Sequence, residues 1–374
     1  MKNLILFTII FWSHGLLKSQ SDFNSNEFYN QGMEYFRLKK YELAHAAFGT
    51  CLEYDQQNAK AWYFKAGCAM QMRNLNEAID DYSKAITINP TLKEAYLYKG
   101  NAQLIKGDYQ QAIQTLTVLI NMDAGNKQAY NQRGSAYMKI EKYAEAIEDF
   151  NQAIIRGLHN YTVFFNRAIC KQNDGDWHGA LDDFNAAADI KPSEVAPSIE
   201  KTRLYAQNNQ WPEVIAEASL AIKKAASKPE LYYYRGFAKL MMEDLNGAAA
   251  DFDICLGLDP KYEAARKNKA LVSYNLKKFD QAIVEYTYLL STDSKNEKLY
   301  LQRGICYLEL GDYHRALSDF DDALKFNKNL PEAYFNRANV YTKLQEVGKA
   351  CSDIKDAARL GYEPATAHIN NICK

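Results

Sequence analysis

The chain of 374 residues carries 45 basic and 46 acidic residues, and 47% of its residues are hydrophobic and 24% charged. This balance argues against extensive disorder, which combines low hydrophobicity with high net charge, and against a nucleic-acid-binding protein, which normally presents a basic face. Beyond the N-terminal segment, no stretch is apolar for the roughly 18 residues that a membrane helix requires. We therefore expect no integral membrane segment in the mature chain.

The first residues have the layout of a secretory signal peptide. Lys2 supplies a positive charge, residues 4–12 form a short apolar core, and the small residue Ser19 follows. Such a core is too short to span a bilayer comfortably. We expect a signal peptide over residues 1–19, cleaved near Ser19, and a protein exported to the periplasm or secreted. An uncleaved anchor is the alternative. Residues 20–24 form a short lead-in.

The rest of the chain is one repeat of 34 residues. Numbering each repeat from Ser25 gives ten repeats over residues 25–364 without an insertion or deletion. Position 20 is alanine in nine repeats, and position 17 is apolar in all ten. Apolar residues at positions 4, 8 and 11, and again at 17, 20, 24 and 27, follow helical spacing, so each repeat predicts two amphipathic helices. The register is set by glycines at position 8, namely Gly32, Gly100, Gly134, Gly236 and Gly304.

A glycine also marks the expected turn between the two helices. Position 15 is Gly107, Gly175 or Gly311 in three repeats, as suits a tight helix end. One hairpin of this kind cannot bury its apolar face alone, so neighbouring repeats must stack.

This pattern resembles the tetratricopeptide repeat (TPR) family. The residues that carry the resemblance include AYNQRGSAYMKIEKYAEAIEDFNQAI at 129–154 and LYLQRGICYLELGDYHRALSDFDDAL at 299–324. The resemblance covers residues 25–364. It implies an all-α protein, an α-solenoid of about ten TPR helix hairpins that form a right-handed superhelix. It also implies that the first helix of each repeat lines a concave face, where partners bind.

Two places depart from a regular array. Repeat six (residues 195–228) has Thr202 at position 8 and a proline in each helix, which indicates either drift or a partner contact built around Trp211. Residues 365–374 predict a short closing helix in which Ile369 and Ile372 would cover repeat ten.

Charged residues also form columns. Position 7 is basic in nine repeats and position 23 is acidic in eight. The basic column alone could be a binding stripe for an acidic ligand. The matching acidic column favours ion pairs between helices instead. The basic residues are Lys65, Lys99, Arg133, Arg167, Lys201, Arg235, Lys269, Arg303 and Arg337, and the acidic ones are Asp81, Asp149, Asp183, Glu217, Asp251, Glu285, Asp319 and Asp353.

The seven cysteines fall into two groups. Cys351 and Cys373 lie in the last hairpin and in the closing segment, where a disulfide would fasten the end of the array if their Cα atoms lie within about 7 Å. The other five occupy apolar columns and are expected to be small core residues, namely Cys51, Cys68, Cys170, Cys255 and Cys306.

The resemblance places partner contacts at positions 2, 5, 9 and 12 of each first helix. This lining is more apolar and aromatic than charged, and aromatic residues with arginine and asparagine among them are typical anchors of binding surfaces. Packing between neighbouring repeats is the alternative role for part of it. The candidate partner-binding residues are Tyr29, Tyr63, Met70, Asn101, Phe165, Arg203, Tyr233, Phe237, Lys267, Tyr274, Phe335 and Asn339.

The expected function is that of an exported, non-enzymatic scaffold that binds protein or peptide segments in its concave groove. The alternative is a chaperone-like assembly factor for secreted or envelope proteins. The lysine and asparagine pattern of the family's chaperone-tail clamp does not occur in three consecutive repeats, since Lys267 is followed by Leu271 and Asn101 follows Leu97. An enzyme is disfavoured because no zinc-protease, serine-hydrolase, phosphate-loop or dinucleotide motif is present. We expect no cofactor, no metal and no nucleic-acid partner.

Overall fold

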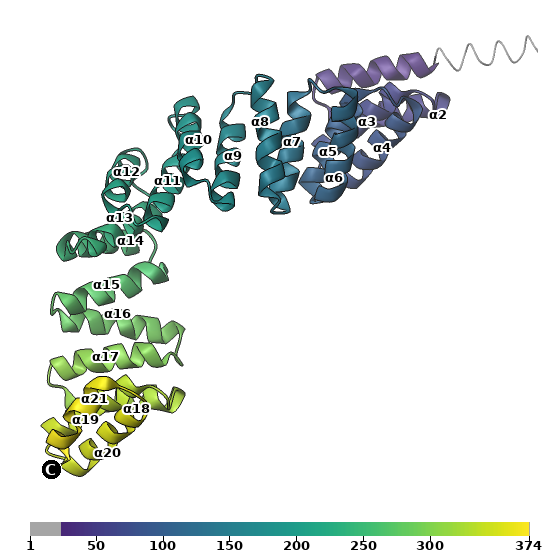
Figure 1. Ribbon diagram of the computed structural model, residues 1–374. Helices are drawn as coiled ribbons and strands as arrows, with labels where there is room; N and C mark the ends of the chain where they lie inside the picture. The colour runs from purple at the N-terminus through teal and green to yellow at the C-terminus, as the bar shows by residue number, and fades with distance from the viewer. Residues whose placement is uncertain (1–23, 374) are drawn as a thin grey trace, which may run out of the picture. The chain divides into compact units, whose positions relative to one another are not determined.

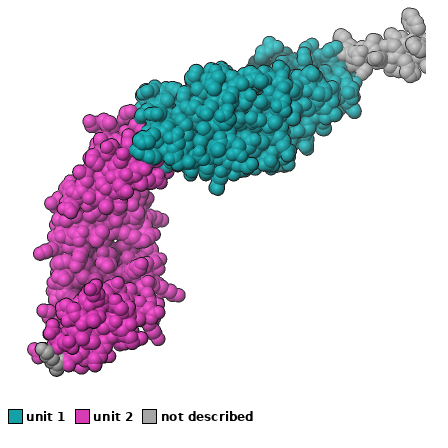
Figure 2. Space-filling view, viewed as in Figure 1, with its two compact units in different colours: residues 1–192 teal, residues 193–374 magenta. Residues whose placement is uncertain are grey.

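The computed structural model describes residues 24–373, which lie in helices and in the short connections between them. The chain divides into two compact units, residues 1–192 and 193–374 (Figure 2). The all-α expectation and the arrangement in helix hairpins are confirmed in both units. The predicted signal peptide, residues 1–19, lies outside the described residues. Among the described helices, none combines the length and the apolar character needed to cross a bilayer.

Unit 1 is a row of helices in which each packs against the next one along the chain (Figure 1). The short connections make successive helices antiparallel. Residues 24–37 form its first described helical stretch. The others are α2 (Tyr41–Tyr54), α3 (Ala59–Gln71), α4 (Leu75–Ile88), α5 (Lys93–Lys106), α6 (Tyr109–Met122), α7 (Lys127–Lys139), α8 (Tyr143–Ile155), α9 (Tyr161–Asp174) and α10 (Trp177–Ile190).

Unit 2 is built in the same way and ends on a shorter helix. Its helices are α11 (Ala196–Gln207), α12 (Trp211–Lys224), α13 (Pro229–Met241), α14 (Leu245–Leu258), α15 (Glu263–Asn275), α16 (Phe279–Thr292), α17 (Glu297–Glu309), α18 (Tyr313–Phe326), α19 (Pro331–Lys343), α20 (Val347–Arg359) and α21 (Glu363–Ile372).

Side-chain caps occur at several helix starts, at fixed positions of the repeat. At position 34, Asn58 and Asn126 each accept a hydrogen bond at 3.0 Å from the backbone N–H three residues later. At position 16, Asp176 and Asp244 do the same for the second helix at 2.9 Å. These short polar side chains satisfy N–H groups that have no partner within the helix. From α2 to α20, the second helix of every repeat begins at position 17, including those such as α2 and α4 that have no side-chain cap.

The turn between the two helices is the same in all ten repeats, although only three carry glycine there. Position 15 has a positive φ in every repeat, with values of 56–65° for the seven non-glycine residues. The N–H of position 16 then bonds back to the carbonyl of position 11, as in Asn74 to Ala69 and Asp108 to Gln103, both at 2.8 Å. This is the hydrogen bond of a Schellman helix end. The left-handed backbone conformation costs roughly 1–2 kcal/mol at each of these non-glycine residues, and the folded array tolerates this cost.

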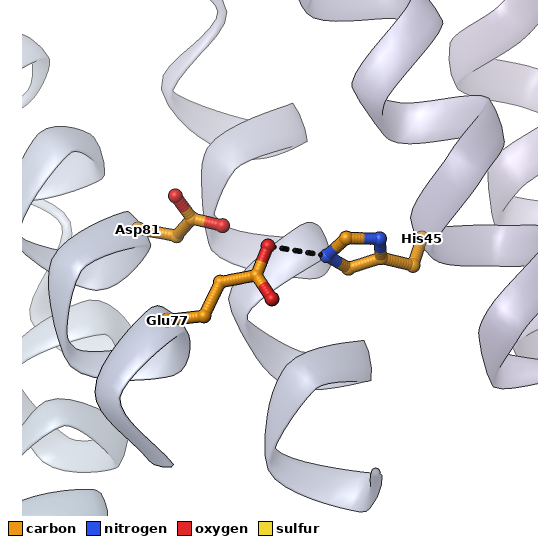
Figure 3. Close-up of side chains that lie close together, drawn as sticks. All are labelled: His45, Glu77 and Asp81. Carbon is orange, nitrogen blue, oxygen red and sulfur yellow. Dashed lines mark hydrogen bonds and ion pairs between the residues drawn. The ribbon is translucent and has the colours of Figure 1, made fainter. Parts of the chain in front are cut away.

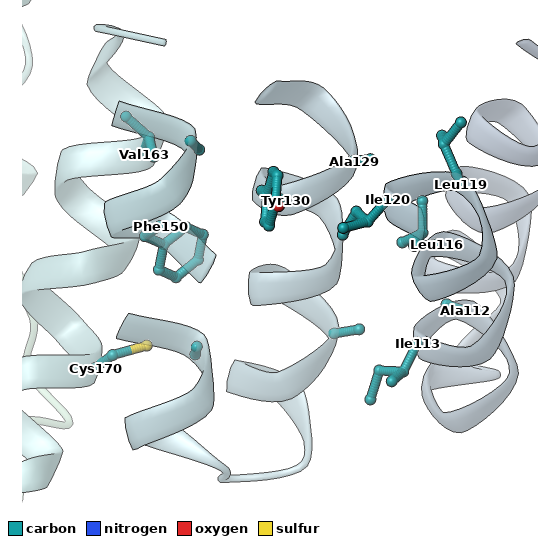
Figure 4. Packing of buried hydrophobic residues seen from close by; sticks show 13 residues of the cluster. Ala112, Ile113, Leu116, Leu119, Ile120, Ala129, Tyr130, Phe150, Val163 and Cys170 are labelled. Carbon is teal, nitrogen blue, oxygen red and sulfur yellow. The ribbon is translucent and has the colours of Figure 1, made fainter. Parts of the chain in front are cut away.

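Close approach of the two helices in a hairpin depends on the small residue at position 8. A Cβ atom on Gly100 would lie 2.6 Å from Leu116, and one on Gly304 would lie 2.8 Å from the Phe320 ring. Both partners occupy position 24 and are fully buried. Figure 4 shows such packing in unit 1, where residues such as Phe150 lie between adjacent helices.

Repeat six keeps this packing because its larger residue is at position 8 and its smaller residue is at position 24. Thr202 at position 8 is larger than in other repeats, and Ala218 at position 24 is smaller than the usual ring. Thr202 is fully buried, and its hydroxyl donates to the Ser198 carbonyl at 2.8 Å. The substitution is therefore compensated in volume and in hydrogen bonding, and the helices α11 and α12 remain intact.

The charge columns form ion pairs, and several of these pairs are also joined to a neighbouring repeat. Arg303 makes a two-pronged contact with Asp319 at 2.8 and 2.7 Å and also donates to Thr287 of the preceding repeat at 3.1 Å. We call this arrangement the position-7 clasp. The same link from position 7 to position 23 occurs in eight repeats: Lys65–Asp81, Arg133–Asp149, Arg167–Asp183, Lys201–Glu217, Arg235–Asp251, Lys269–Glu285, Arg303–Asp319 and Arg337–Asp353.

Lys99 is the exception in this column. The residue 16 positions later, where the other repeats hold a carboxylate, is Thr115, and no ion pair involves Lys99 among the described residues. Burial lowers the pKa of the Lys99 ammonium, an effect that Asp80 opposes. The third repeat thus carries a half-buried cation without the partner that stabilises its counterparts.

The closing helix α21 covers the end of repeat ten. Ala365 is buried, and Ile369 and Ile372 pack against the cluster that contains Ile354 of α20. Cys351 and Cys373 are bonded, with their Sγ atoms 2.11 Å apart and their Cα atoms 4.9 Å apart. The five other cysteines are buried free thiols. Burial raises the pKa of the Cys68 thiol to about 12, so it remains protonated and unreactive at neutral pH.

Completing the clasp in repeat three should stabilise unit 1. We expect Thr115→Asp to raise the free energy of unfolding by roughly 0.5–1 kcal/mol, because its carboxylate would pair with Lys99. Hydrogen exchange of the α5 and α6 amides measures this change locally. Thr115→Asn is the uncharged control, and in a Lys99→Met background Thr115→Asp should become destabilising. Equal effects of Asp in both backgrounds would contradict the pairing.

Breaking the disulfide should loosen α21 while leaving the preceding hairpins folded. The bond closes a separation of 22 residues, a constraint worth about 3 kcal/mol against unfolding. We expect Cys373→Ser to speed amide exchange in α21 much more than in α17 or α18. A reducing agent should have the same effect on the native chain and none on the variant. Unchanged exchange in α21 after reduction would show that packing alone holds it.

Candidate functional site

Three of the predicted groove residues share a cavity in unit 1. Tyr63, Met70 and Asn101 line a space of about 270 Å³, which we call the aromatic cavity. Its other lining residues come from repeats one to three and are Phe36, Phe64, Gly67, Gln71, Tyr82 and Tyr98. The sequence had indicated positions 5, 9 and 12 of the first helices, and the structure brings these three positions together here.

Helical spacing explains how one helix supplies much of this wall. Tyr63, Gly67 and Met70 follow one another at intervals of four and three residues on α3, so they lie on the same face. Gly67 has no side chain, and a Cβ atom there would come within 3.5 Å of the Phe36 ring. Gly67 therefore takes up none of the space that it lines. Asn101 and Tyr98 enter from α5.

The aromatic rings of the cavity support one another. The Tyr63 ring centroid lies 5.8 Å from that of Tyr82 and 6.0 Å from that of Tyr98, and the Tyr98 ring stacks on Tyr82 at 6.4 Å. Tyr82 is 2% exposed, whereas the Tyr98 side chain is 43% exposed. A fully packed ring therefore holds an accessible ring in place, as a preformed binding surface requires.

The electrostatic environment of the cavity is neutral to negative. Burial raises the pKa of Tyr63 to about 12, with further contributions from Tyr98 and the carboxylate of Glu94. Tyr63 is thus an uncharged phenol at neutral pH. The polar lining groups are the tyrosine hydroxyls and the amides of Gln71 and Asn101, and no lining residue is basic. The arrangement suits binding rather than proton transfer or nucleophilic chemistry.

The two remaining groove residues of unit 1 pack elsewhere. Tyr29 lies 5.8 Å from the Phe48 ring and 6.3 Å from the Phe64 ring, both measured between centroids. Phe165 packs between Tyr161 at 5.4 Å and Phe184 at 5.6 Å. Neither lines the aromatic cavity, and both contribute mainly to packing between helices.

Unit 2 contains a second aromatic cluster. Tyr233 and Phe237 stack at 6.2 Å, and the Trp211 ring meets Phe237 edge-on at 5.7 Å. Arg203 donates to the Tyr234 hydroxyl at 3.2 Å and pairs with Glu200 at 3.0 Å. The irregular repeat six thus contacts repeat seven through the Trp211 ring and through Arg203, which is hydrogen-bonded to Tyr234.

The four other predicted residues of unit 2 lie in different surroundings. Lys267 pairs with Glu263 on the surface, and Tyr274 packs on Phe279. Phe335 packs between Tyr362 at 5.2 Å and His368 at 5.9 Å, beneath the closing helix. Asn339 lines a wider space of about 700 Å³ together with residues of α17, α18 and α21. The structure does not gather these residues into one site.

One ionic cluster was not predicted from the sequence. His45 Nε2 lies 2.8 Å from Glu77 Oε1, and Asp81 lies beside them (Figure 3). In the sequence, His45 is at position 21 of repeat one, and Glu77 and Asp81 are at positions 19 and 23 of repeat two. A histidine and two carboxylates can bind a divalent metal, and their ligand atoms lie within 4.8 Å of one another.

Lys65 already supplies the positive charge of this cluster. Its Nζ lies 2.8 Å from Glu77 and 2.6 Å from Asp81. The hydrogen bond from Lys65 lowers the pKa of the Glu77 carboxyl, although partial burial opposes this. Burial would lower the pKa of Lys65, but its bonds to Asp81 and Glu77 outweigh burial and raise it. The cluster is therefore a variant of the position-7 clasp, with His45 attached.

Comparison with protein families identifies repeats in both units. Models described as tetratricopeptide repeat match residues 28–58, 59–92, 82–114 and 128–156, and a model described as TPR repeat matches residues 306–345. The aromatic cavity falls within the first three matched segments.

Curated relatives resemble only short parts of the chain. The "DnaJ homolog subfamily C member 7 homolog" of Dictyostelium discoideum is 30% identical over 78 residues, which are 20% of this chain and 14% of that protein. The "U-box domain-containing protein 70" of Oryza sativa subsp. japonica is 26% identical over 78 residues, 21% of this chain and 10% of that protein. The chain spans about a seventh of the length of the first relative and about a tenth of the length of the second.

A solved structure is similar in fold. The C-terminal part of a TPR repeat-containing protein from Cytophaga hutchinsonii superposes with a TM-score of 0.57 and 18% sequence identity, covering 63% of this chain and 97% of that one. At this identity the likeness concerns the fold alone.

Proposed function

We propose that this chain, which is built from tetratricopeptide repeats, binds extended protein or peptide segments in the groove formed by its first helices. The fold is a scaffold suited to protein–protein interaction, and the aromatic cavity is the observation that carries the finer proposal. There, three groove residues chosen from sequence position lie around one accessible space, namely Tyr63, Met70 and Asn101.

The composition of the cavity supports a binding role. It offers an accessible tyrosine ring held by buried aromatic neighbours, and amide groups at its edge. Aromatic residues in desolvated pockets contribute most of the binding energy in many interfaces. Catalytic motifs are absent from the sequence, so we propose a non-enzymatic role. The proposal concerns a scaffold, and a chaperone-like role in holding clients would use the same groove with faster exchange.

Peptides selected on the full chain test this function. We expect panning of a random dodecapeptide display library to yield binders that lose affinity at least about fivefold with Tyr98→Ala or Asn101→Ala, since truncating an anchor removes more than about 1 kcal/mol. Tyr54→Ala is the matched control, because Tyr54 is equally exposed at 43% and lies outside the cavity. Circular dichroism checks that helicity is retained. Selected peptides that bind all three variants equally would contradict the proposal.

We also propose that the protein is exported. The support is the N-terminal sequence, with Lys2, the apolar core at residues 4–12 and the small residue Ser19. N-terminal sequencing of the protein from its native source should find a mature end near Gln20. An intact Met1 on a cytoplasmic protein would overturn this proposal.

A further inference from the structure

Aromatic rings in this protein are repeatedly covered by cations of the same chain. Lys84 Nζ lies 4.1 Å from the Trp62 ring centroid, and the guanidinium of Arg156 lies 4.4 Å from that of Tyr130. Arg266 covers Tyr288 at 3.6 Å. Such contacts are attractive because the ring face is electronegative.

The aromatic cavity differs in this respect. Among the described residues, no lysine or arginine side chain is placed over the rings of its five aromatic residues. None of the lining residues is basic either. The cavity therefore combines several electronegative ring faces with no cation from this chain. The five rings are those of Phe36, Tyr63, Phe64, Tyr82 and Tyr98.

Polar groups around the cavity add to the attraction for a cation. Glu94 lies one helical turn before Tyr98 on α5, and its charge acts on Tyr63, whose pKa it helps to raise. The amide oxygens of Asn101 and Gln71 are hydrogen-bond acceptors at the edge of the space. A positively charged group would thus find ring faces, acceptors and a nearby carboxylate together.

The size of the cavity limits what it can hold. At about 270 Å³ it is slightly smaller than the pockets that take drug-sized ligands, which begin at roughly 300 Å³. One long side chain of a bound segment is a suitable occupant. Arginine fits these features best, because its planar guanidinium stacks on aromatic rings, is weakly hydrated, and carries several N–H donors.

We infer that the aromatic cavity receives an arginine side chain of the bound partner segment, with the guanidinium against the exposed Tyr98 ring and its N–H groups donating to Asn101 and Gln71. This inference rests on the proposed function and specifies the partner: a segment with a basic residue where it crosses α3 and α5. Lysine and neutral side chains are the competing occupants that an experiment must distinguish.

The test uses the peptides selected on the full chain as probes. Each arginine is replaced in turn by citrulline, which has nearly the same shape without the charge, and by lysine. We expect one citrulline replacement to weaken binding roughly five- to thirtyfold, and lysine to weaken it less. Tyr98→Leu keeps an apolar side chain but removes the ring, and it should reduce the difference between arginine and citrulline at that position to the part that Glu94 contributes.

Glu94→Gln tests the electrostatic part. We expect it to weaken the arginine peptide, more at low than at high salt, and to leave the citrulline peptide unchanged. Glu332→Gln is the matched control, since Glu332 has the same repeat position at the start of α19.

Peptides that depend on Tyr98 but tolerate citrulline everywhere, or that contain lysine or no basic residue there, would overturn the arginine inference while leaving groove binding intact. If no selected peptide depends on a cavity residue, the proposed function fails and the inference fails with it.

Discussion

The position-7 clasp is the interaction on which the regular stacking of repeats depends. In eight repeats a basic side chain on the first helix reaches a carboxylate 16 residues later that is buried or nearly so, and in several repeats it also reaches a polar group 16 residues earlier. The carboxylates are nearly inaccessible, as with Asp149 at 4% and Asp251 at 2% exposure. A buried carboxylate without its partner would be strongly destabilising. Only one register between neighbouring helices satisfies these groups, so the clasp contributes specificity as well as stability.

Packing at position 8 imposes a second constraint. It allows less variation in the sequence than the charge columns do. The helices approach so closely that the side chains at positions 8 and 24 must share one volume. In repeat nine the small residue is Gly304 on the first helix and the large one is Phe320 on the second. In repeat six the order is reversed, with the larger Thr202 on the first helix and the small Ala218 on the second. Repeat six therefore belongs to the array despite its unusual sequence. Its Trp211 packs on Phe237 of the next repeat, so a residue that stands out in the sequence serves at least partly to join two repeats.

A constant framework of this kind leaves the groove positions free to vary. The helix register, turns and clasps repeat almost unchanged, while positions 5, 9 and 12 change their chemistry from repeat to repeat. In repeats one to three these positions assemble rings, a glycine opening and an asparagine into the aromatic cavity. In repeats six and seven the same positions hold Arg203 and rings already engaged with one another. We therefore propose that partner binding is local and centres on the aromatic cavity.

The sequence alone determined the helices, their register and the pairing columns, because a period of 34 residues repeated ten times reports which face of each helix is buried. It predicted the paired charges, the buried cysteines and the covering role of Ile369 and Ile372 from position alone. It could not tell which groove residues share a space: Tyr63 lines the aromatic cavity, whereas Tyr29 at the same repeat position packs into the core. Nor could it place His45 beside Glu77, or a left-handed residue at Glu141. Periodicity identifies a face, but the reach of a side chain and the neighbour that meets it depend on distances that exist only after the helices have packed.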